Sequence, residues 1–431
     1  MTDIKKMEQY LVEICSNVKS DRSEELEHMW YKKGLGVVFL NENEIEKFEA
    51  AIDELYTDDY IKSNFPRSYL RNEFQNIILE ALQKSGVDRS EFISNELGEL
   101  RSKLKKDIKK FNFIIPISNL KIENNFNIGN VTFKKLDEVK NIIEKIGNPD
   151  GDKELQLGLE QRYQYLAPTC AEVSVQGVPI FAQTEAYNRI RLAVNSLKLY
   201  NRTDDPVWGI KGEILTPNIR MIFSYENEEA KDHPGWKISV GRVGPPKTYK
   251  ITSKTLELMN RHHFNTINQI LNKSRNNDLE TRLLTSIYWF GESLSTPFIE
   301  EEKDVVYKKK KLKHQNLEYF RLGERLIKLF TALEAILIFD KTDPVTESIL
   351  ERTPLLFSMD PKQRIDCKTY LEKLYEKRSQ IVHYGNTGVS HQDVRILTQI
   401  VRTIIFALLK MSEDYEFKNV KNLKDHLDEL K

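Results

Sequence analysis

The sequence predicts an α+β multidomain protein, because three stretches of its 431 residues differ in hydrophobic pattern. Residues 1–108 are charged and carry apolar residues at helical spacing, which predicts a helical N-terminal region. Residues 109–255 alternate apolar and polar residues between Asn, Gly and Pro, so we expect a mixed α/β middle domain. Residues 256–431 return to helical spacing and predict an all-α four-helix bundle.

Two helices are expected in the N-terminal region. In "SYLRNEFQNIILEALQKSG" one face collects the apolar residues Leu70, Phe74, Ile77 or Ile78, and Ala81. Gly86 follows where a C-cap glycine is expected to end the helix. The segment "SNELGELRSKLKKDIKKF" predicts a second, highly charged helix, and the pattern changes at Phe111.

The middle domain is expected to contain several strands and one helix. "FNFIIPISNLKIENNFNIGNVTFKKL" has a strand–turn–strand pattern, because apolar and polar residues alternate along residues 120–123 and 131–134. Further strands are expected at "AEVSVQG", "NIRMIFSYE" and "GWKISVGRV". Residues 182–200 have helical spacing, with inward positions at Ala186, Ile190, Val194 and Leu197.

Four amphipathic helices are expected in the C-terminal region. The first two are "LETRLLTSIYWFGESLS" and "EYFRLGERLIKLFTALEAILIF", and the third covers about residues 361–383. The fourth is "SHQDVRILTQIVRTIIFALLKM", where Ser390 and Asp393 form an S-x-x-D start close to a capping box. Its apolar run around Phe406 is wider than the single stripe that packing in one bundle would bury. Part of this run is therefore expected to face a second copy of the chain.

Composition excludes several broad classes of protein. The charges balance to a formal net charge of zero. A protein that coats nucleic acid non-specifically would have a large positive net charge, so this class is not expected. Cys15, Cys170 and Cys367 are far apart and odd in number, so a disulfide framework or a Cys-based zinc site is not expected. No secretory signal is evident, and the apolar runs are far shorter than the ~20 residues that span a bilayer. We expect a cytoplasmic protein with no membrane contact.

Common catalytic motifs are missing from the sequence. It contains no G-x-x-x-x-G-K-[ST], no G-x-S-x-G and no H-E-x-x-H. Adjacent His262 and His263 would point to different faces of a helix, which is poor metal-binding geometry. Cys367 has no histidine nearby in sequence, which favours a small packed residue over a nucleophile. We therefore expect no metal and no cofactor.

The segment "LYEKRSQIVHYGNTG" places an arginine on an apolar stripe. Arg378 lies four residues after Leu374 and three before Ile381, and a half-buried guanidinium is costly unless an anion meets it. The pattern R-x4–6-H alone is weak, because 21 arginines and 8 histidines give about one match by chance. Arg22 and His28 also fit it, but the glutamates between them would repel a phosphate. Only the later match lies within the predicted helical array.

Arg378 and His383 together suit phosphodiester chemistry. A guanidinium binds phosphate bidentately and stays charged, whereas an imidazole exchanges protons near neutral pH. The pair could therefore cleave RNA through its own 2′-hydroxyl without a metal, with His383 favoured in its protonated form near a helix C-terminus. Five residues at about 100° each separate the two side chains by about 140° around an ideal helix. Either the helix loosens before His383, or two copies of the motif combine across a dimer.

The C-terminal third resembles the HEPN superfamily of α-helical ribonucleases, and within it the Apea-like HEPN group. The resemblance rests on "SIYWFGESL", "FTALEAIL", "YEKRSQIVHYG" and the closing amphipathic helix, over about residues 277–415. The β-rich segment that begins at Phe111 is similar to one that often precedes such domains. The resemblance implies a HEPN four-helix bundle that forms a homodimer, with one metal-independent RNase site at the facing motifs. It also implies a role as a toxin or anti-phage defence effector.

Carried over by position, the resemblance implies Arg378 and His383 as catalytic residues. Ser379 stands where the superfamily often has Asn, Asp or His, so a second proton-active group at that position is in doubt. Glu334 stands where such proteins often carry an acid, and it would orient Arg378. Tyr384 completes the set of supporting residues.

Other interpretations of these residues stay open. Arg378 could form a purely structural ion pair with Glu334, with His383 as a helix C-cap, and Glu334 could be an ordinary solvated residue. A lysine run has two possible roles, contact with an RNA backbone or a solvated loop. It comprises Lys308, Lys309, Lys310, Lys311 and Lys313. The expected partners are RNA, a second copy of the chain, and a phage-derived or toxin–antitoxin regulator. The rival function is a catalytically silent HEPN module that binds a protein partner or a nucleotide.

Overall fold

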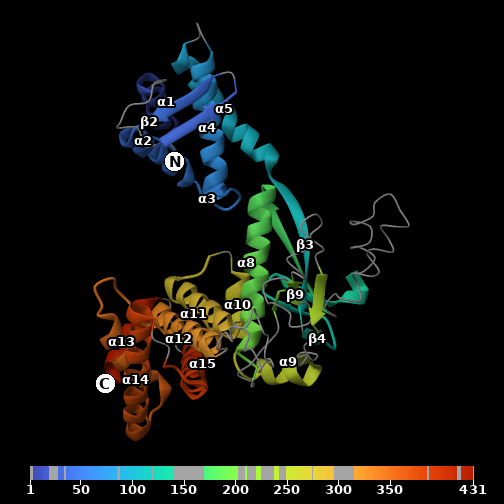
Figure 1. The fold of residues 1–431 in the computed structure, drawn as a ribbon, viewed down its shortest axis with the longest axis vertical. Helices are drawn as coiled ribbons and strands as arrows, with labels where there is room; N and C mark the ends of the chain where they lie inside the picture. The colour runs from blue at the N-terminus through green and yellow to red at the C-terminus, as the bar shows by residue number, and fades with distance from the viewer. Residues whose placement is uncertain are drawn as a thin grey trace, which may run out of the picture. The chain divides into compact units, whose positions relative to one another are not determined.

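A computed structural model gives the fold of the chain (Figure 1). It describes residues 3–18, 28–33, 35–84, 88–118, 120–139, 169–201, 209–210, 220–224, 237–241, 249–273, 275–295, 315–385, 388–414 and 419–430. These residues are mostly helical, with a small region of mixed β-sheet, which confirms the predicted combination of helices and strands. The chain forms two compact units, Met1–Phe113 with Ser174–Tyr187, and Ile114–Val173 with Asn188–Lys431.

The described residues from 3 to 107 of the first unit form five helices and a two-stranded hairpin. The elements are α1 (Ile4–Asn17), β1 (His28–Lys32), β2 (Gly36–Leu40), α2 (Glu42–Tyr56), α3 (Asp59–Lys62), α4 (Arg67–Gln83) and α5 (Arg89–Asp107). Asn41 begins α2 with a capping box, because its side chain and that of Glu44 each accept from the other's backbone N–H. A core that includes Leu11, Phe48 and Phe74 holds these elements together.

The two helices predicted in this region are confirmed as α4 and α5. The predicted inward face of α4 is buried, and α4 ends at Gln83 with Lys84 as C-cap. The expected cap Gly86 lies outside the described residues. The hairpin was not expected within a helical region, although the β-branched and aromatic residues of "WYKKGLGVVF" around two glycines favour a hairpin.

The strand predictions of the middle region are also confirmed. The largest sheet has the order β5–β6–β7–β3–β8, and shorter two-stranded pairs join β9 to β10 and β11 to β4. The strands are β3 (Lys109–Ser118), β4 (Leu120–Ile122), β5 (Phe126–Ile128), β6 (Val131–Lys135), β7 (Thr169–Gly177), β8 (Gly209–Ile210), β9 (Arg220–Ser224), β10 (Lys237–Gly241) and β11 (Tyr249–Ile251). The predicted helix is α8 (Pro179–Lys198), and its four predicted inward residues are buried.

The C-terminal region contains eight described helices, of which all but α9 contribute to one hydrophobic core. They are α9 (Ser253–Asn260), α10 (Phe264–Asn272), α11 (Asp278–Ser295), α12 (Gln315–Leu337), α13 (Val345–Phe357), α14 (Pro361–Tyr384), α15 (His391–Asp414) and α16 (Val420–Glu429). The four predicted helices correspond to α11, α12, α14 and α15, and their predicted stripes contribute buried residues to this core. Helices α9, α10, α13 and α16 were not predicted individually from the sequence. Within α13, Pro354 interrupts the helical pattern.

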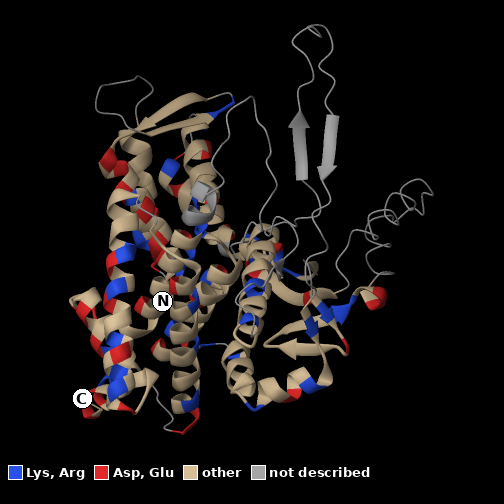
Figure 2. Ribbon diagram, turned by 60° about the horizontal axis from the view of Figure 1, so that its bottom comes forward, with Lys and Arg blue, Asp and Glu red and all other residues tan. Residues whose placement is uncertain are grey.

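The charge pattern agrees with the balanced composition. Basic and acidic residues are interspersed along the described helices (Figure 2). Among the described helices, none combines the length and the apolar character needed to cross a membrane.

Candidate functional site

Helix α14 carries the predicted catalytic pair and is regular over its whole length. It begins after Asp360, whose side chain accepts from the backbone N–H of Lys362, and Pro361 occupies the first turn. It ends at Tyr384, where Gly385 adopts a left-handed conformation (φ 64°) and donates to the carbonyls of Gln380 and Ile381. The helix therefore does not loosen before His383.

Arg378 lies on the buried side of α14, as its spacing predicted. Its Nη2 donates to Oε1 of Glu334 at 2.9 Å, and its Nη1 lies 3.5 Å from the hydroxyl of Tyr375. The guanidinium carbon is 5.2 Å from the centre of the Tyr375 ring. The Nε atom is buried and has no hydrogen-bond partner. The guanidinium thus has donors that an anion could still occupy.

Glu334 reaches Arg378 from α12 in a partly buried environment. The side chains of Arg378 and Glu334 are 25% and 23% exposed. Burial raises the pKa of the Glu334 carboxyl, and the charge of Arg378 opposes this effect without cancelling it. Phe330, one turn earlier on α12, packs edge-on against Tyr375 at 5.2 Å between ring centres. The aromatic pair and the ion pair together fix the position of the guanidinium.

His383 lies on another side of the same helix. Its side chain is exposed, and no hydrogen bond joins its imidazole to any residue that the structure describes. Tyr384 is 83% exposed, with its ring centre 6.2 Å from that of His383. Ser379 is partly buried next to Arg378. Because α14 stays helical to Tyr384, one chain holds Arg378 and His383 about 140° apart around the helix axis.

The start of α15 is fixed by an ion pair and a capping box. Asp393 accepts from Lys377 Nζ at 2.6 Å and from the backbone N–H and hydroxyl of Ser390 at 2.7 Å each. The N–H of Asp393 is 3.2 Å from the Ser390 hydroxyl, which confirms the predicted capping box. Burial raises the pKa of Asp393, but Lys377 and Ser390 outweigh this and hold it below its usual value.

None of the other sequence candidates that the structure describes lies at this site. The lysine run from Lys308 to Lys313 and the alternative Arg22 lie outside the described residues, and His28 is exposed on β1. His263 holds a left-handed backbone conformation (φ 63°), and its Nδ1 lies 2.6 Å from Glu413. Within the described part of the chain, no group of three His, Cys, Asp or Glu side chains is arranged to hold a metal ion.

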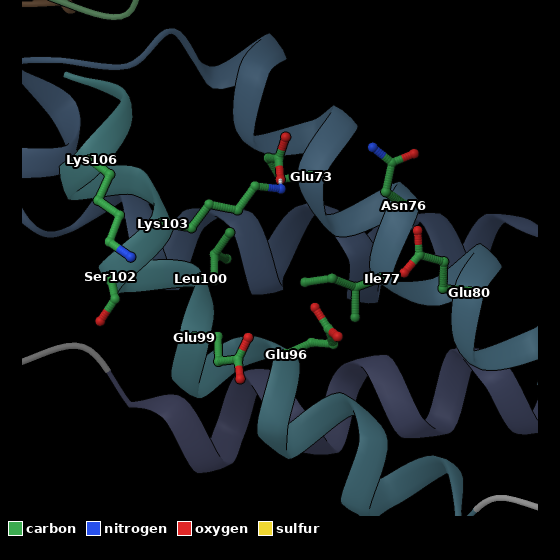
Figure 3. Close-up of a pocket in the computed structure, with 10 residues that line it drawn as sticks. All are labelled: Glu73, Asn76, Ile77, Glu80, Glu96, Glu99, Leu100, Ser102, Lys103 and Lys106. Carbon is green, nitrogen blue, oxygen red and sulfur yellow. Dashed lines mark hydrogen bonds and ion pairs between the residues drawn. The ribbon is translucent and has the colours of Figure 1, made fainter. Parts of the chain in front are cut away.

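A separate cavity of about 510 Å³ lies between α4 and α5 in the first unit (Figure 3). Four glutamates, Glu73, Glu80, Glu96 and Glu99, line it together with Lys103 and Lys106. Lys103 Nζ is 2.7 Å from Glu73, so part of this charge is neutralised within the cavity wall. The lining contains none of the predicted site residues.

A buried polar cluster between α8 and α11 was missed by sequence reasoning. Arg191 donates to both carboxylate oxygens of Glu292, at 3.0 and 2.9 Å, and Asn195 donates to the same carboxylate at 3.0 Å. Lys198 is almost fully buried and donates to Asn195, to Ser295 and to the carbonyl of Gly291. The sequence signal was available, because polar residues recur every three or four positions from 191 to 198.

Comparison with known proteins gives no further assignment. No protein-family model, no curated protein and no solved structure matches the chain. The interpretation of the site therefore depends on the residues of α12 and α14.

Proposed function

We propose that the chain is a metal-independent endoribonuclease of the HEPN type, a toxin or anti-phage defence effector that acts in the cytoplasm. In this proposal α11, α12, α14 and α15 form the HEPN four-helix bundle. Arg378 and His383 are the catalytic residues, and Glu334 positions the arginine.

The observation that carries the proposal is the state of Arg378. Its guanidinium is held by one firm hydrogen bond to Glu334, while the buried Nε has no partner. A buried donor without a partner costs about 1–3 kcal/mol. A phosphate oxygen at Nε would remove this cost and would neutralise the positive charge.

The proposed reaction is attack of an RNA 2′-hydroxyl on its own phosphate. The O2′–P bond forms, the P–O5′ bond breaks, and the products are a 2′,3′-cyclic phosphate and a 5′-hydroxyl. His383 moves a proton at one of these two oxygens, and Arg378 stabilises the charge on the phosphorane. The geometry of α14 favours contributions from two chains, because one chain presents the two side chains on different sides of the helix.

The test is RNA cleavage by single-residue variants. We expect Arg378→Ala and His383→Ala each to reduce cleavage by at least about 10²-fold, since each removes one catalytic group. Sequencing of RNA ends should detect 2′,3′-cyclic phosphates or their opened forms, and cleavage should persist in EDTA. Arg22→Ala and His28→Ala serve as controls and should cleave normally. Full activity in both α14 variants, or a strict magnesium requirement, would contradict the proposal.

The second candidate is a catalytically silent HEPN module that binds a protein partner or a nucleotide. The ion pair between Arg378 and Glu334 favours it, because a purely structural arginine would form the same contact. A purified protein that leaves all RNA intact, alone and with cell extract from phage-infected bacteria, would support this alternative.

A further inference from the structure

The β1–β2 hairpin of the first unit has one face turned toward the core and one turned away from it. On the inner face, Trp30 packs edge-on against Phe48 of α2 at 4.9 Å between ring centres, and Val38 and Leu40 are buried. The antiparallel register pairs Met29 with Phe39 and Tyr31 with Val37, so these four side chains share the other face.

The outer face is apolar and aromatic and is open to solvent. Met29 is 66% exposed and Tyr31 is 68% exposed, while Val37 and Phe39 are partly exposed and are not packed against the core of this unit. Tyr31 and Phe39 are diagonal neighbours across the two strands, with Cβ atoms about 7 Å apart. This separation is about twice the rise of 3.4 Å per nucleotide along one strand of duplex DNA.

The charges of the hairpin suit an anionic ligand. Within residues 28–40 the charged side chains are Lys32 and Lys33 near the turn, whereas Glu24, Glu25 and Glu27 precede the opposite end of β1 in the sequence. Lys32 is 3.3 Å from Glu80 of α4, which leaves the exposed Lys33 beside the outer face. Aromatic side chains that stack bases, flanked by cations that meet phosphates, are the usual elements of single-strand recognition.

The size of the face disfavours a stable protein interface. Two strands of five residues cover a surface of about 17 by 10 Å, on the order of 170 Å². A stable protein interface buries about 800 Å² on each partner. An area of this size matches two or three stacked nucleotides better than a folded partner.

We propose that the outer face of the β1–β2 hairpin binds single-stranded nucleic acid, with bases stacked on Tyr31 and Phe39 and a phosphate near Lys33. RNA is the expected form, and this preference alone rests on the proposed nuclease function. The hairpin would then hold a strand at a place other than the Arg378 site.

The test is fluorescence anisotropy of a labelled 12-nucleotide oligo-U with the full-length His383→Ala protein. Tyr31→Ala and Phe39→Ala should each raise the dissociation constant by at least fivefold, the lower range for loss of one base–aromatic contact. Tyr31→Phe should bind like the parent, because it keeps the ring. Lys33→Ala should lower the slope of log affinity against log salt by about 0.7. Tyr60→Ala, which removes another exposed tyrosine of this unit, is the control and should change nothing.

The outcomes separate this proposal from the nuclease proposal. Unchanged affinity in Tyr31→Ala and Phe39→Ala, or no binding by the parent, would overturn the hairpin proposal. Equal weakening for oligo-U and oligo-dT would support the site and show that it does not select RNA. Because binding is measured with His383→Ala, a wild-type protein that fails to cleave RNA would contradict only the nuclease proposal.

Discussion

The sequence predicted where Arg378 lies on α14, but the contact with Glu334 fits both a catalytic and a structural role. The place of Arg378 on the apolar stripe followed from its spacing to Leu374 and Ile381, and the structure places it on the buried side of α14. The sequence could not predict that Nε of Arg378 has no hydrogen-bond partner, because its partners depend on how α12 and α14 pack. The firm bond to Glu334 is common to both interpretations, so variants of Glu334 should separate them.

Under the proposed function, Glu334→Ala and Glu334→Gln should affect different kinetic parameters. Glu334→Ala removes the acceptor that orients the guanidinium, so kcat should fall about 10- to 100-fold. Glu334→Gln keeps an acceptor oxygen but removes a negative charge near the bound phosphate, so KM should fall while kcat stays within about threefold. Steady-state kinetics on a short RNA would measure both effects.

A matched control for these variants is available on the same helix. Glu324 pairs with Lys328 on α12, with side chains 42% and 20% exposed, and it makes no contact with Arg378, so Glu324→Gln should leave both constants unchanged. If Glu334→Ala cleaved RNA with the parental kcat, Glu334 would have no positioning role.

At the level of elements, helices α8 and α11 are joined by buried charged side chains that the hydrophobic periodicity of α8 did not predict. The stripe Ile190, Val194 and Leu197 predicted which face of α8 is buried. It did not predict that Glu292 and Lys198 are buried beside that face, because the partners come from a helix about 100 residues later. Short-range patterns predict elements, whereas such long-range pairs appear only in the folded chain.

Glu292→Gln should destabilise the protein in a pH-dependent way. Burial raises the pKa of Glu292, but Asn195, Lys198 and Arg191 outweigh this and lower it overall. A lowered pKa stabilises the fold above the unfolded value of about 4.3, and the contribution is lost as pH falls through the folded pKa. We expect a loss of about 3 kcal/mol at pH 7 that shrinks below pH ~4.3, measured by urea unfolding.

An exposed ion pair gives the control for this prediction. Glu257 pairs with Arg261 one turn away, and both side chains are largely exposed. Glu257→Gln should change the unfolding free energy by less than about 0.5 kcal/mol at either pH. Losses in Glu292→Gln that stay equal from pH 7 to well below pH ~4 would show that its charge is not the cause.

Gly291→Ala should destabilise the same contact, although alanine favours helices over glycine by about 1 kcal/mol. A Cβ at position 291 would overlap the side chain of Asn195. Asn195 is fully buried and bonded to Glu292 and Lys198, so it has no room to move. We expect a net loss of about 1–2 kcal/mol in thermal or urea unfolding.

Gly323→Ala on α12 is the matched substitution with the opposite expectation. Its Cβ would meet Ile381 at 3.4 Å, an ordinary contact distance. It should be neutral or should stabilise the protein by up to about 1 kcal/mol. A stabilising Gly291→Ala would show that the close approach of α8 and α11 is not required.

For the whole molecule, the structure changes the reason to expect a dimer. The apolar run of α15 suggested a face for a second copy, but Ile404, Ile405, Leu408 and Leu409 are buried within the chain. Phe406 packs against Tyr200, with ring centres 5.5 Å apart. The sequence showed the apolar excess correctly, but it did not show that other parts of the same chain cover it.

Helix α14 provides the alternative surface for assembly. Ile365 is exposed and lies on the side of α14 that carries His383, and the exposed Tyr384 follows His383 about 100° around the helix axis. Under the proposed function, a two-fold contact along this side would bring two copies of His383 together and bury these apolar groups. Arg378, on the inner side of the same helix, would then meet an RNA phosphate at the edge of the contact.

This arrangement makes activity depend on protein concentration. We expect light scattering to show a dimer, and we expect specific cleavage activity to fall on dilution below its dissociation constant. Ile365→Glu should shift the protein to a monomer and lower cleavage in parallel, because it places a charge in the contact. Leu258→Glu, at an exposed apolar residue of α9, should leave both properties unchanged. A monomer that cleaves RNA with undiminished specific activity would exclude the shared site while leaving the roles of Arg378 and His383 intact.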